Sequence, residues 1–493
     1  MTEQTECGVS LYREHLTCRT RDQIVEKRQV AHRRNQISLR GSRKASRVSF
    51  HLLASVASGL LLTACSSIPG FTSLVGTAPA PALTGSIGTV VADEPQAALV
   101  GHDVLARKGN AADAAVATAI ALGVTLPSRA SLGGGGACLI SQPGAPAQSI
   151  SFLPAAGSSV GGNRPASTPA TLRGLFLIHH HYGSVEFNDL IAPSMNLASN
   201  GITVSRALAS DLAVVRTALL ADENARAIFG RGEAGTLASG DNLIQPRLAG
   251  FLERIRSAGI GDLYNGALAD VYSTAAQKAG GGLNTSDLRK TLPVETVALT
   301  TQSNGISASF LAPPADGGLG AAIRYTTGSS AQGAVSAWRA SGATDIATAQ
   351  AALDNGKTGG SALSALPAST SFVVTDRNGM AVACSLSENN LFGTGRIAGS
   401  TGIVLGASPA ATPRPLLAAA ILRDRRGLKA AIAASGQNDA ADAVGDAARA
   451  ATQGAEIAHS GAGRVNAVTC TDGNNCHGNT DPRGAGLAAG TTN

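Results

Sequence analysis

The chain has 493 residues, a formal net charge of +6 and only 3% aromatic residues. Residues 1–50 hold 11 Lys and Arg against 5 Asp and Glu, so they carry the whole net charge and the remaining chain is neutral. A neutral body offers no basic stripe for phosphate groups, which argues against a nucleic-acid-binding protein. The length allows a large core and two or three domains.

The N-terminal 64 residues have the pattern of an export leader. A basic stretch at 40–47 precedes an apolar run, His51–Leu62, that is too short to cross a bilayer. The run ends in Leu-Thr-Ala-Cys65, which resembles the lipobox of bacterial lipoproteins. This resemblance implies cleavage before Cys65, acylation of that cysteine and a lipid anchor in the inner or outer membrane of the bacterial cell envelope. We expect the protein to face the periplasm or the exterior; an ordinary signal peptide with a chance cysteine is the alternative.

Residues 65–84 are rich in Ser, Pro, Gly and Ala, a composition typical of a tether. A strand is expected next, up to Val91, and Asp93 is the expected N-cap of a helix that ends before Gly109. An Ala-rich helix should then cover about Ala111–Leu122. Residues 165–330 have mostly helical periodicity.

The cysteines of the body fall into two groups. Cys138 and Cys384 lie in apolar runs and are expected to be small buried hydrophobic side chains. Cys470 and Cys476 bracket a turn, and this spacing allows a disulfide between adjacent strands, with two free thiols as the alternative.

The segment Ser369–Asn389 predicts a β-hairpin, because Asn378-Gly379 separates two β-rich runs. Folding the segment about Asn378 places Ser369 opposite Ser387, where facing Cβ atoms are about 5 Å apart. The hairpin therefore brings two hydroxyl groups together, with the amide of Asn389 nearby. A two-residue turn would shift this pairing by one residue.

This hairpin resembles the segment that begins the small subunit of γ-glutamyltransferases, also called glutathione hydrolases. Ser369 takes the place of the family's first Thr, Thr370 matches its second Thr, Ser371 replaces a His, and Ser387 replaces a Thr. Further positions match without a gap, and these are Asp376, Gly379, Ala381, Val382, Asn389 and Phe392–Gly395.

The resemblance runs from about Gly85 to Gly490 and includes the stretches Arg107–Ala117 and Leu132–Gly136. It implies an α/β (α+β) fold, a four-layer αββα sandwich of the N-terminal-nucleophile hydrolase type. It further implies a large-subunit-like region, 85–368, and a small-subunit-like region, 369–493. Self-cleavage between Ala368 and Ser369 would separate these two subunits, which then associate with each other.

In this family the residue exposed by cleavage is the nucleophile, so the resemblance assigns that role to Ser369. Its own α-amine would act as the base, and Ser387 and Asn389 would orient its hydroxyl. Thr370, Gln437 and Asn438 are the expected substrate-binding residues, with the last two in place of the family's oxyanion-hole glycine pair. The substrate would be a small γ-glutamyl compound, and neither a cofactor nor a metal is implied.

Several family positions for substrate recognition differ in this chain. Leu153 stands where an Arg grips the substrate carboxylate, and no carboxylate is present near Ala411, where an Asp binds the substrate amine. Leu417-Ala418 replace a pair of serines. Three hypotheses therefore stand: a γ-glutamyl hydrolase or transferase, a catalytically lapsed envelope lipoprotein with a binding or structural role, and an amidase with a changed substrate.

Overall fold

The computed structural model describes residues 87–158, 162–363, 369–436, 438–459, 461, 463–471 and 475–490. These residues belong to one compact unit, Pro79–Asn493. The predicted leader, the lipidation site at Cys65, the tether, Ala368 and Gln437 lie outside the described residues.

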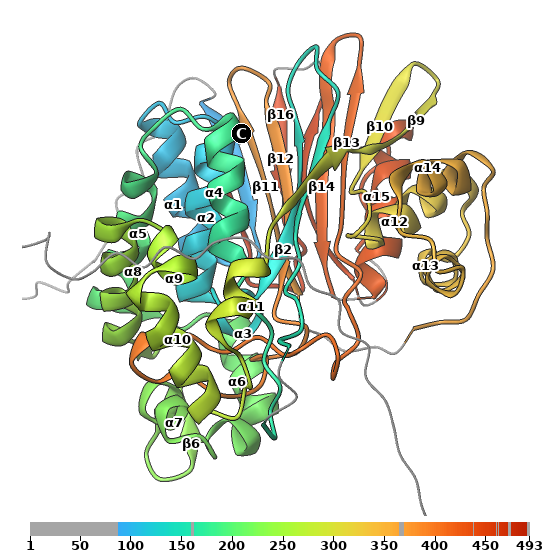
Figure 1. Ribbon diagram of the computed structural model, residues 1–493. Helices are drawn as coiled ribbons and strands as arrows, with labels where there is room; N and C mark the ends of the chain where they lie inside the picture. The colour runs from blue at the N-terminus through green and yellow to red at the C-terminus, as the bar shows by residue number, and fades with distance from the viewer. Residues whose placement is uncertain are drawn as a thin grey trace, which may run out of the picture. The chain divides into compact units, whose positions relative to one another are not determined.

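Two antiparallel sheets form the centre of the unit (Figure 1). The first sheet has the order β17 (Leu487–Ala489), β1 (Gly88–Ala92), β11 (Ser369–Asp376), β12 (Ala381–Ser387), β2 (Gly135–Ser141), β3 (Gln148–Phe152), β8 (Val294–Val297). The second has the order β16 (Cys476–Asn479), β15 (Arg464–Cys470), β14 (Gly427–Ser435), β13 (Ala418–Asp424), β10 (Ile306–Phe310), β9 (Leu299–Ser303). Two short sheets pair β4 (Ile202–Thr203) with β7 (Asn242–Leu243) and β5 (Gly230–Arg231) with β6 (Gly235–Thr236).

Helices cover the outer face of each large sheet (Figure 1). Those on the side of the first sheet are α1 (Pro95–Ala106), α2 (Ala111–Thr125), α3 (Pro127–Ala130), α4 (Thr171–Tyr182), α5 (Phe187–Asn200), α6 (Arg206–Leu219), α7 (Glu223–Phe229), α8 (Pro246–Ala258), α9 (Gly261–Asn265), α10 (Ala267–Lys278) and α11 (Thr285–Lys290), with the 3₁₀ turn η1 (Gly399–Thr401). Those on the second sheet are α12 (Gly317–Thr327), α13 (Ala331–Ala340), α14 (Ile346–Asp354) and α15 (Asp439–Gln453).

Three apolar layers separate these four layers of secondary structure. One lies between the helices and the first sheet, one between the two sheets, and one between the second sheet and α12–α15. The layer between the sheets consists largely of small side chains such as Ala137, Ala383, Ala419 and Ala433. The predicted αββα sandwich is therefore confirmed, as is the mostly helical middle region.

The helix predicted over Ala111–Leu122 extends to Thr125, and all 15 of its residues are buried. Asn110 and Asp113 form a capping box at its N-terminus. The small residues of this helix allow it to pack closely against β11 and β12, so it forms the support behind the predicted hairpin.

The predicted N-cap at Asp93 is wrong. Glu94 caps α1, and its carboxylate accepts hydrogen bonds from the backbone N–H groups of Gln96 (2.9 Å) and Ala97 (3.4 Å). Because Pro95 is the first helical residue, the capping position falls on the residue directly before it. Asp93 turns instead toward β11.

The hairpin has the predicted register, with Ser369 opposite Ser387 and Thr375 opposite Ala381. The N–H group of Asp376 donates to Met380, which leaves a three-residue loop centred on Asn378. Gly379 has φ +79°, the left-handed conformation that such a loop requires at this position. The side-chain carboxylate of Asp376 accepts hydrogen bonds from the N–H groups of Asn378 and Met380, so local hydrogen bonds fix the turn.

Substitution of Gly379 by Ala should lower the free energy of unfolding by about 1–2 kcal/mol, because a Cβ atom is strained at this φ. A methyl group there would also lie 3.3 Å from Cγ of Pro143. Chemical denaturation of the variant and of the unsubstituted protein measures the difference. Equal stability would contradict a left-handed residue at this position.

Candidate active site

Four serines line the open end of the hairpin, in two facing pairs. Ser369 is opposite Ser387, and Ser371 is opposite Ser385. These residues alternate with side chains of the helix-facing core, so all four point into the layer between the sheets. All four are buried. The layer between the sheets thus changes from mostly apolar side chains, such as Val373, Ala381 and Ala383, near the turn to serine hydroxyl groups at the open end.

Ser369 is the first residue of β11 and is only 1% exposed. Its Oγ accepts a hydrogen bond of 3.2 Å from the backbone N–H of Gly436, which directly follows β14 of the second sheet. Gly436 has φ +106°, a conformation that favours glycine. The second sheet therefore delivers a backbone donor to the predicted nucleophile, a contact that the sequence did not reveal.

The two residues predicted to orient the nucleophile lie at the end of β12. The N–H group of Asn389 donates to Oγ of Ser387 at 2.9 Å. The side-chain amide of Asn389 donates to the carbonyl oxygen of Ala407 at 2.9 Å, and Asn389 has φ +60°. The structure thus brings Ser369, Ser387 and Asn389 together, while the amide of Asn389 fixes the neighbouring loop.

The other predicted site residues have separate positions. The hydroxyl of Thr370 donates to Oδ2 of Asp93 at 3.0 Å, on the opposite face of β11 from Ser369. Asn438 is buried and directly precedes α15, one residue beyond Gln437. Their substrate-binding roles stay predictions.

The positions that depart from the family pattern are apolar or exposed. Leu153 is half-buried and packs against the core between the sheets. Leu417 is buried in the same core, and Ala411 is exposed. Because Leu153 contacts apolar side chains, this position provides no charge for a substrate carboxylate.

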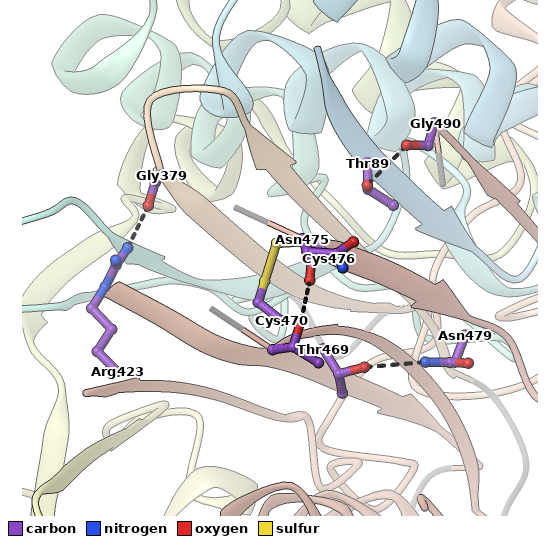
Figure 2. Close-up of a disulfide and its surroundings, with 10 residues drawn as sticks. Thr89, Gly379, Arg423, Thr469, Cys470, Asn475, Cys476, Asn479 and Gly490 are labelled. Atoms are coloured by element: carbon purple, nitrogen blue, oxygen red, sulfur yellow. Dashed lines mark hydrogen bonds between the residues drawn. A yellow bond between two sulfur atoms is a disulfide. The ribbon is translucent and has the colours of Figure 1, made fainter. Parts of the chain in front are cut away.

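Two disulfides join strands of the described chain. Cys470 and Cys476 are paired across β15 and β16, as their spacing allows (Figure 2). Cys138 and Cys384 are buried, as predicted, but they also form a disulfide that was not predicted. They face each other on β2 and β12, a register between strands 246 residues apart that no local pattern indicates.

Within the described residues, no group of three or more His, Cys, Asp or Glu is placed to hold a metal ion. A search of the same residues finds no helix that is both long and apolar enough to span a membrane. A cavity of about 570 Å³ lies between α10 and η1 and is lined by Asp270, Lys278 and Ser400 among others. None of its lining residues belongs to the hairpin.

A buried carboxyl group lies between Ser387 and Asn389. Glu388 has no exposed surface, and its Oε1 accepts from the backbone N–H of Ser131 at 2.9 Å. Its Oε2 has no hydrogen-bond partner among the described residues. Burial raises the pKa of Glu388 well above its ordinary value, against the smaller opposing effect of the Ser131 hydrogen bond. No sequence pattern identified this residue.

We expect Glu388→Gln to change how stability depends on pH. Because the pKa of Glu388 is raised on folding, its proton-linked contribution is fully present below the ordinary Glu pKa and is lost as pH rises toward the folded value. The glutamine variant has no such proton. Denaturation midpoints between pH 4 and pH 8 should therefore show the variant gaining stability relative to the unsubstituted protein as pH rises. A difference that does not change with pH would contradict a raised pKa at the buried carboxyl group.

Part of the chain is similar to one family of known proteins. Residues 97–326 match the family model described as Gamma-glutamyltranspeptidase. The glutathione hydrolase proenzyme of Escherichia coli is 33% identical over 251 residues, which are 47% of this chain and 43% of the relative. The glutathione hydrolase proenzyme of Bacillus subtilis is 30% identical over 255 residues, 48% of this chain and 43% of the relative. The match thus spans less than half the length of these curated relatives.

Among solved structures, a cephalosporin acylase from Bacillus halodurans has the same fold, with a TM-score of 0.67 at 17% identity. The likeness covers 84% of this chain and 98% of the acylase. It extends the fold assignment well beyond the segment that the family model matches. Over residues 97–326 the chain resembles the gamma-glutamyltranspeptidase family, and it has the αββα fold of the solved acylase.

Proposed function

We propose that the protein hydrolyses or transfers a γ-glutamyl group, with glutathione-type compounds as substrates, through a nucleophile made by self-cleavage between Ala368 and Ser369. One observation carries this proposal: Ser369 begins β11, faces Ser387 and receives the Gly436 N–H at its Oγ. The relatives named glutathione hydrolase support the substrate class.

Self-cleavage needs only the residues at this strand end and one water molecule. Oγ of Ser369 attacks the carbonyl carbon of Ala368, the C–N bond breaks, and the hydroxyl proton passes to the nitrogen. Water then hydrolyses the resulting ester, which leaves a carboxylate on Ala368 and a free hydroxyl and α-amine on Ser369. As the hydroxyl loses its proton, the N–H of Gly436 would stabilise the negative charge on Oγ, whereas the charge of the tetrahedral intermediate develops on the carbonyl oxygen of Ala368.

The hydroxyl and the α-amine of Ser369 then act on the substrate. The α-amine of Ser369, with a pKa of about 8, takes the hydroxyl proton as Oγ attacks the γ-glutamyl carbonyl. The leaving amine receives that proton, and an ester joins the γ-glutamyl group to Ser369. Water or a second amine opens the ester and restores the hydroxyl. Ser387 and Asn389 hold the strand end on which this chemistry takes place.

The processed parts would stay together because their strands alternate in both sheets. In the first sheet β11 lies beside β1, and β12 lies beside β2. In the second sheet β13 pairs with β10. Because β1 also pairs with β17, strands from before and after Ser369 share hydrogen bonds in four strand pairs.

A second candidate function follows from Leu153. An apolar side chain in place of the family's Arg suits an amide substrate that lacks the α-carboxylate of glutamate. An amidase of this kind would use the same nucleophile and the same self-cleavage. Loss of all turnover in a folded protein would instead support the non-enzymatic envelope role.

We also propose the cell envelope as the location, with a lipid anchor on Cys65. Two disulfides among the described residues support an oxidising compartment outside the cytoplasm.

Turnover of a γ-glutamyl anilide tests the function directly. The unsubstituted protein should release the aniline, and Ser369→Ala should reduce that release to background because no other residue replaces the nucleophile. Ser371→Ala is the matched control, since Ser371 lies on the same face of β11 and should keep most of the activity. Release of aniline from an acyl anilide without the glutamyl amine and carboxylate would identify the changed-substrate amidase. No turnover of either anilide would refute the enzyme proposals.

The Cys138–Cys384 disulfide predicts how the cleaved protein behaves on gels. Cys138 precedes the cleavage site and Cys384 follows it, so the two parts should run as one band without reductant and as two bands with it. Cys138→Ser should give two bands under both conditions. Cys470→Ser is the control and should behave like the unsubstituted protein, because Cys470 and Cys476 both follow the cleavage site. Two bands without reductant in the unsubstituted protein would contradict the Cys138–Cys384 pair.

A further inference from the structure

We propose that Asp93 is a positioning residue for the nucleophile Ser369, and that Asn466 holds Asp93 in place. This inference rests on the proposed function. Asp93 directly follows β1, and its carboxylate contacts the first residues of β11. Oδ2 accepts from the hydroxyl of Thr370 at 3.0 Å and from the N–H of Ser371 at 3.1 Å. Oδ1 accepts from Nδ2 of Asn466 at 2.8 Å.

Asn466 connects this carboxylate to the second sheet. The residue is fully buried on β15, and its Nδ2 lies 3.0 Å from the carbonyl oxygen of Ser371 and 2.9 Å from its Oγ. Two of the three neighbours, the carboxylate and the carbonyl, are acceptors only, so the nitrogen of the amide must face them. A fixed set of hydrogen bonds therefore joins β1, β11 and β15 within two residues of Ser369.

These hydrogen bonds become important once the chain is cleaved before Ser369. Cleavage makes Ser369 a chain terminus, and termini fray unless other contacts hold them. Ser371 and Thr370 are held by Asp93, so the terminus has only one residue beyond its anchor. Since a misplaced reacting group lowers rates steeply, the hydrogen bonds to Asp93 should decide how well Ser369 reaches a carbonyl carbon.

The carboxylate also acts on the α-amine of Ser369 through its charge. Ser369 lies two residues before Ser371, a separation of about 7 Å along a strand, so the amine is within about 10 Å of Asp93. A negative charge at this range favours the protonated amine and raises its pKa. Removal of the charge should move the amine, and the acid limb of the pH–rate profile, to lower pH.

Asp376 provides a matched control at the other end of β11. Its carboxylate also accepts three hydrogen bonds, from the N–H groups of Asn378 (2.8 Å), Met380 (3.1 Å) and Ala111 (2.9 Å). An amide at either position cannot accept all three bonds with the same geometry, because one of its two terminal atoms is a donor. Asp376→Asn therefore disturbs the same strand to a similar degree, but far from Ser369.

The experiment compares full-length Asp93→Asn, Asp376→Asn and unsubstituted protein. Self-cleavage is followed by intact mass, γ-glutamyl anilide turnover is measured against pH, and thermal midpoints report folding. Both variants should unfold at lower temperature. Asp93→Asn should cleave and turn over at least about tenfold more slowly, with its acid limb lower by about half a pH unit. Asp376→Asn should stay within about twofold of the unsubstituted rates at temperatures where it is folded.

Equal rates and equal pH profiles for the two variants would overturn the inference and leave Asp93 a structural anchor only. The proposed function fails in a different way, through an unsubstituted protein that neither cleaves nor turns over substrate. That outcome would overturn both proposals, because Asp93 would then have no nucleophile to position.

Discussion

The antiparallel register between β11 and β12 is the constraint on which the rest of the candidate site depends. It places Ser369 opposite Ser387 and directs both side chains into the layer between the sheets. A shift of one residue in either strand would turn that strand's serines toward α2 and its apolar side chains toward the second sheet. The three-residue loop at Asn378, closed by the backbone hydrogen bond from Asp376 to Met380 and by Gly379, excludes that shift. The geometry of a turn about nine residues away therefore determines which side chains face each other in the site.

The register also connects the hairpin to both of its neighbours. Its helix-facing side carries Cys384, which is joined to Cys138 on β2. Its other side carries Ser385, whose hydroxyl lies 3.2 Å from the carbonyl oxygen of Ala418 and 3.1 Å from that of Ala434. Because alanine makes up half of the buried apolar side chains in the layer between the sheets, the second sheet comes close enough for these contacts and for the Gly436 N–H to reach Ser369. Small side chains thus bring a backbone donor to the proposed nucleophile.

Much of the fold and part of the site follow from the sequence. The Asn-Gly turn and the alternation of the flanking strands predict the hairpin and the Ser369–Ser387 pair correctly. The family-like motifs predict the αββα sandwich, which the structure and its likeness to a solved acylase confirm. These features are local, or they carry a pattern that repeats along the chain.

What the sequence did not predict depends on contacts between distant segments. Asp93 has the pattern of an N-cap, yet it contacts residues 277 and 278 positions away. Cys138 and Cys384 have the pattern of core residues, and only the pairing of β2 with β12 makes them a disulfide. Gly436 and Glu388 belong to no motif. The departure at Leu153, by contrast, is visible in the sequence, and the structure adds that this side chain contacts an apolar core.

The intact mass of the purified, reduced protein tests the central claim most directly. If Ser369 is a nucleophile made by self-cleavage, the spectrum contains a fragment whose mass equals residues 369–493, and its N-terminal sequence begins Ser-Thr-Ser-Phe. A single mass that spans the Ala368–Ser369 bond would contradict the account, provided that a thermal denaturation curve shows the protein to be folded.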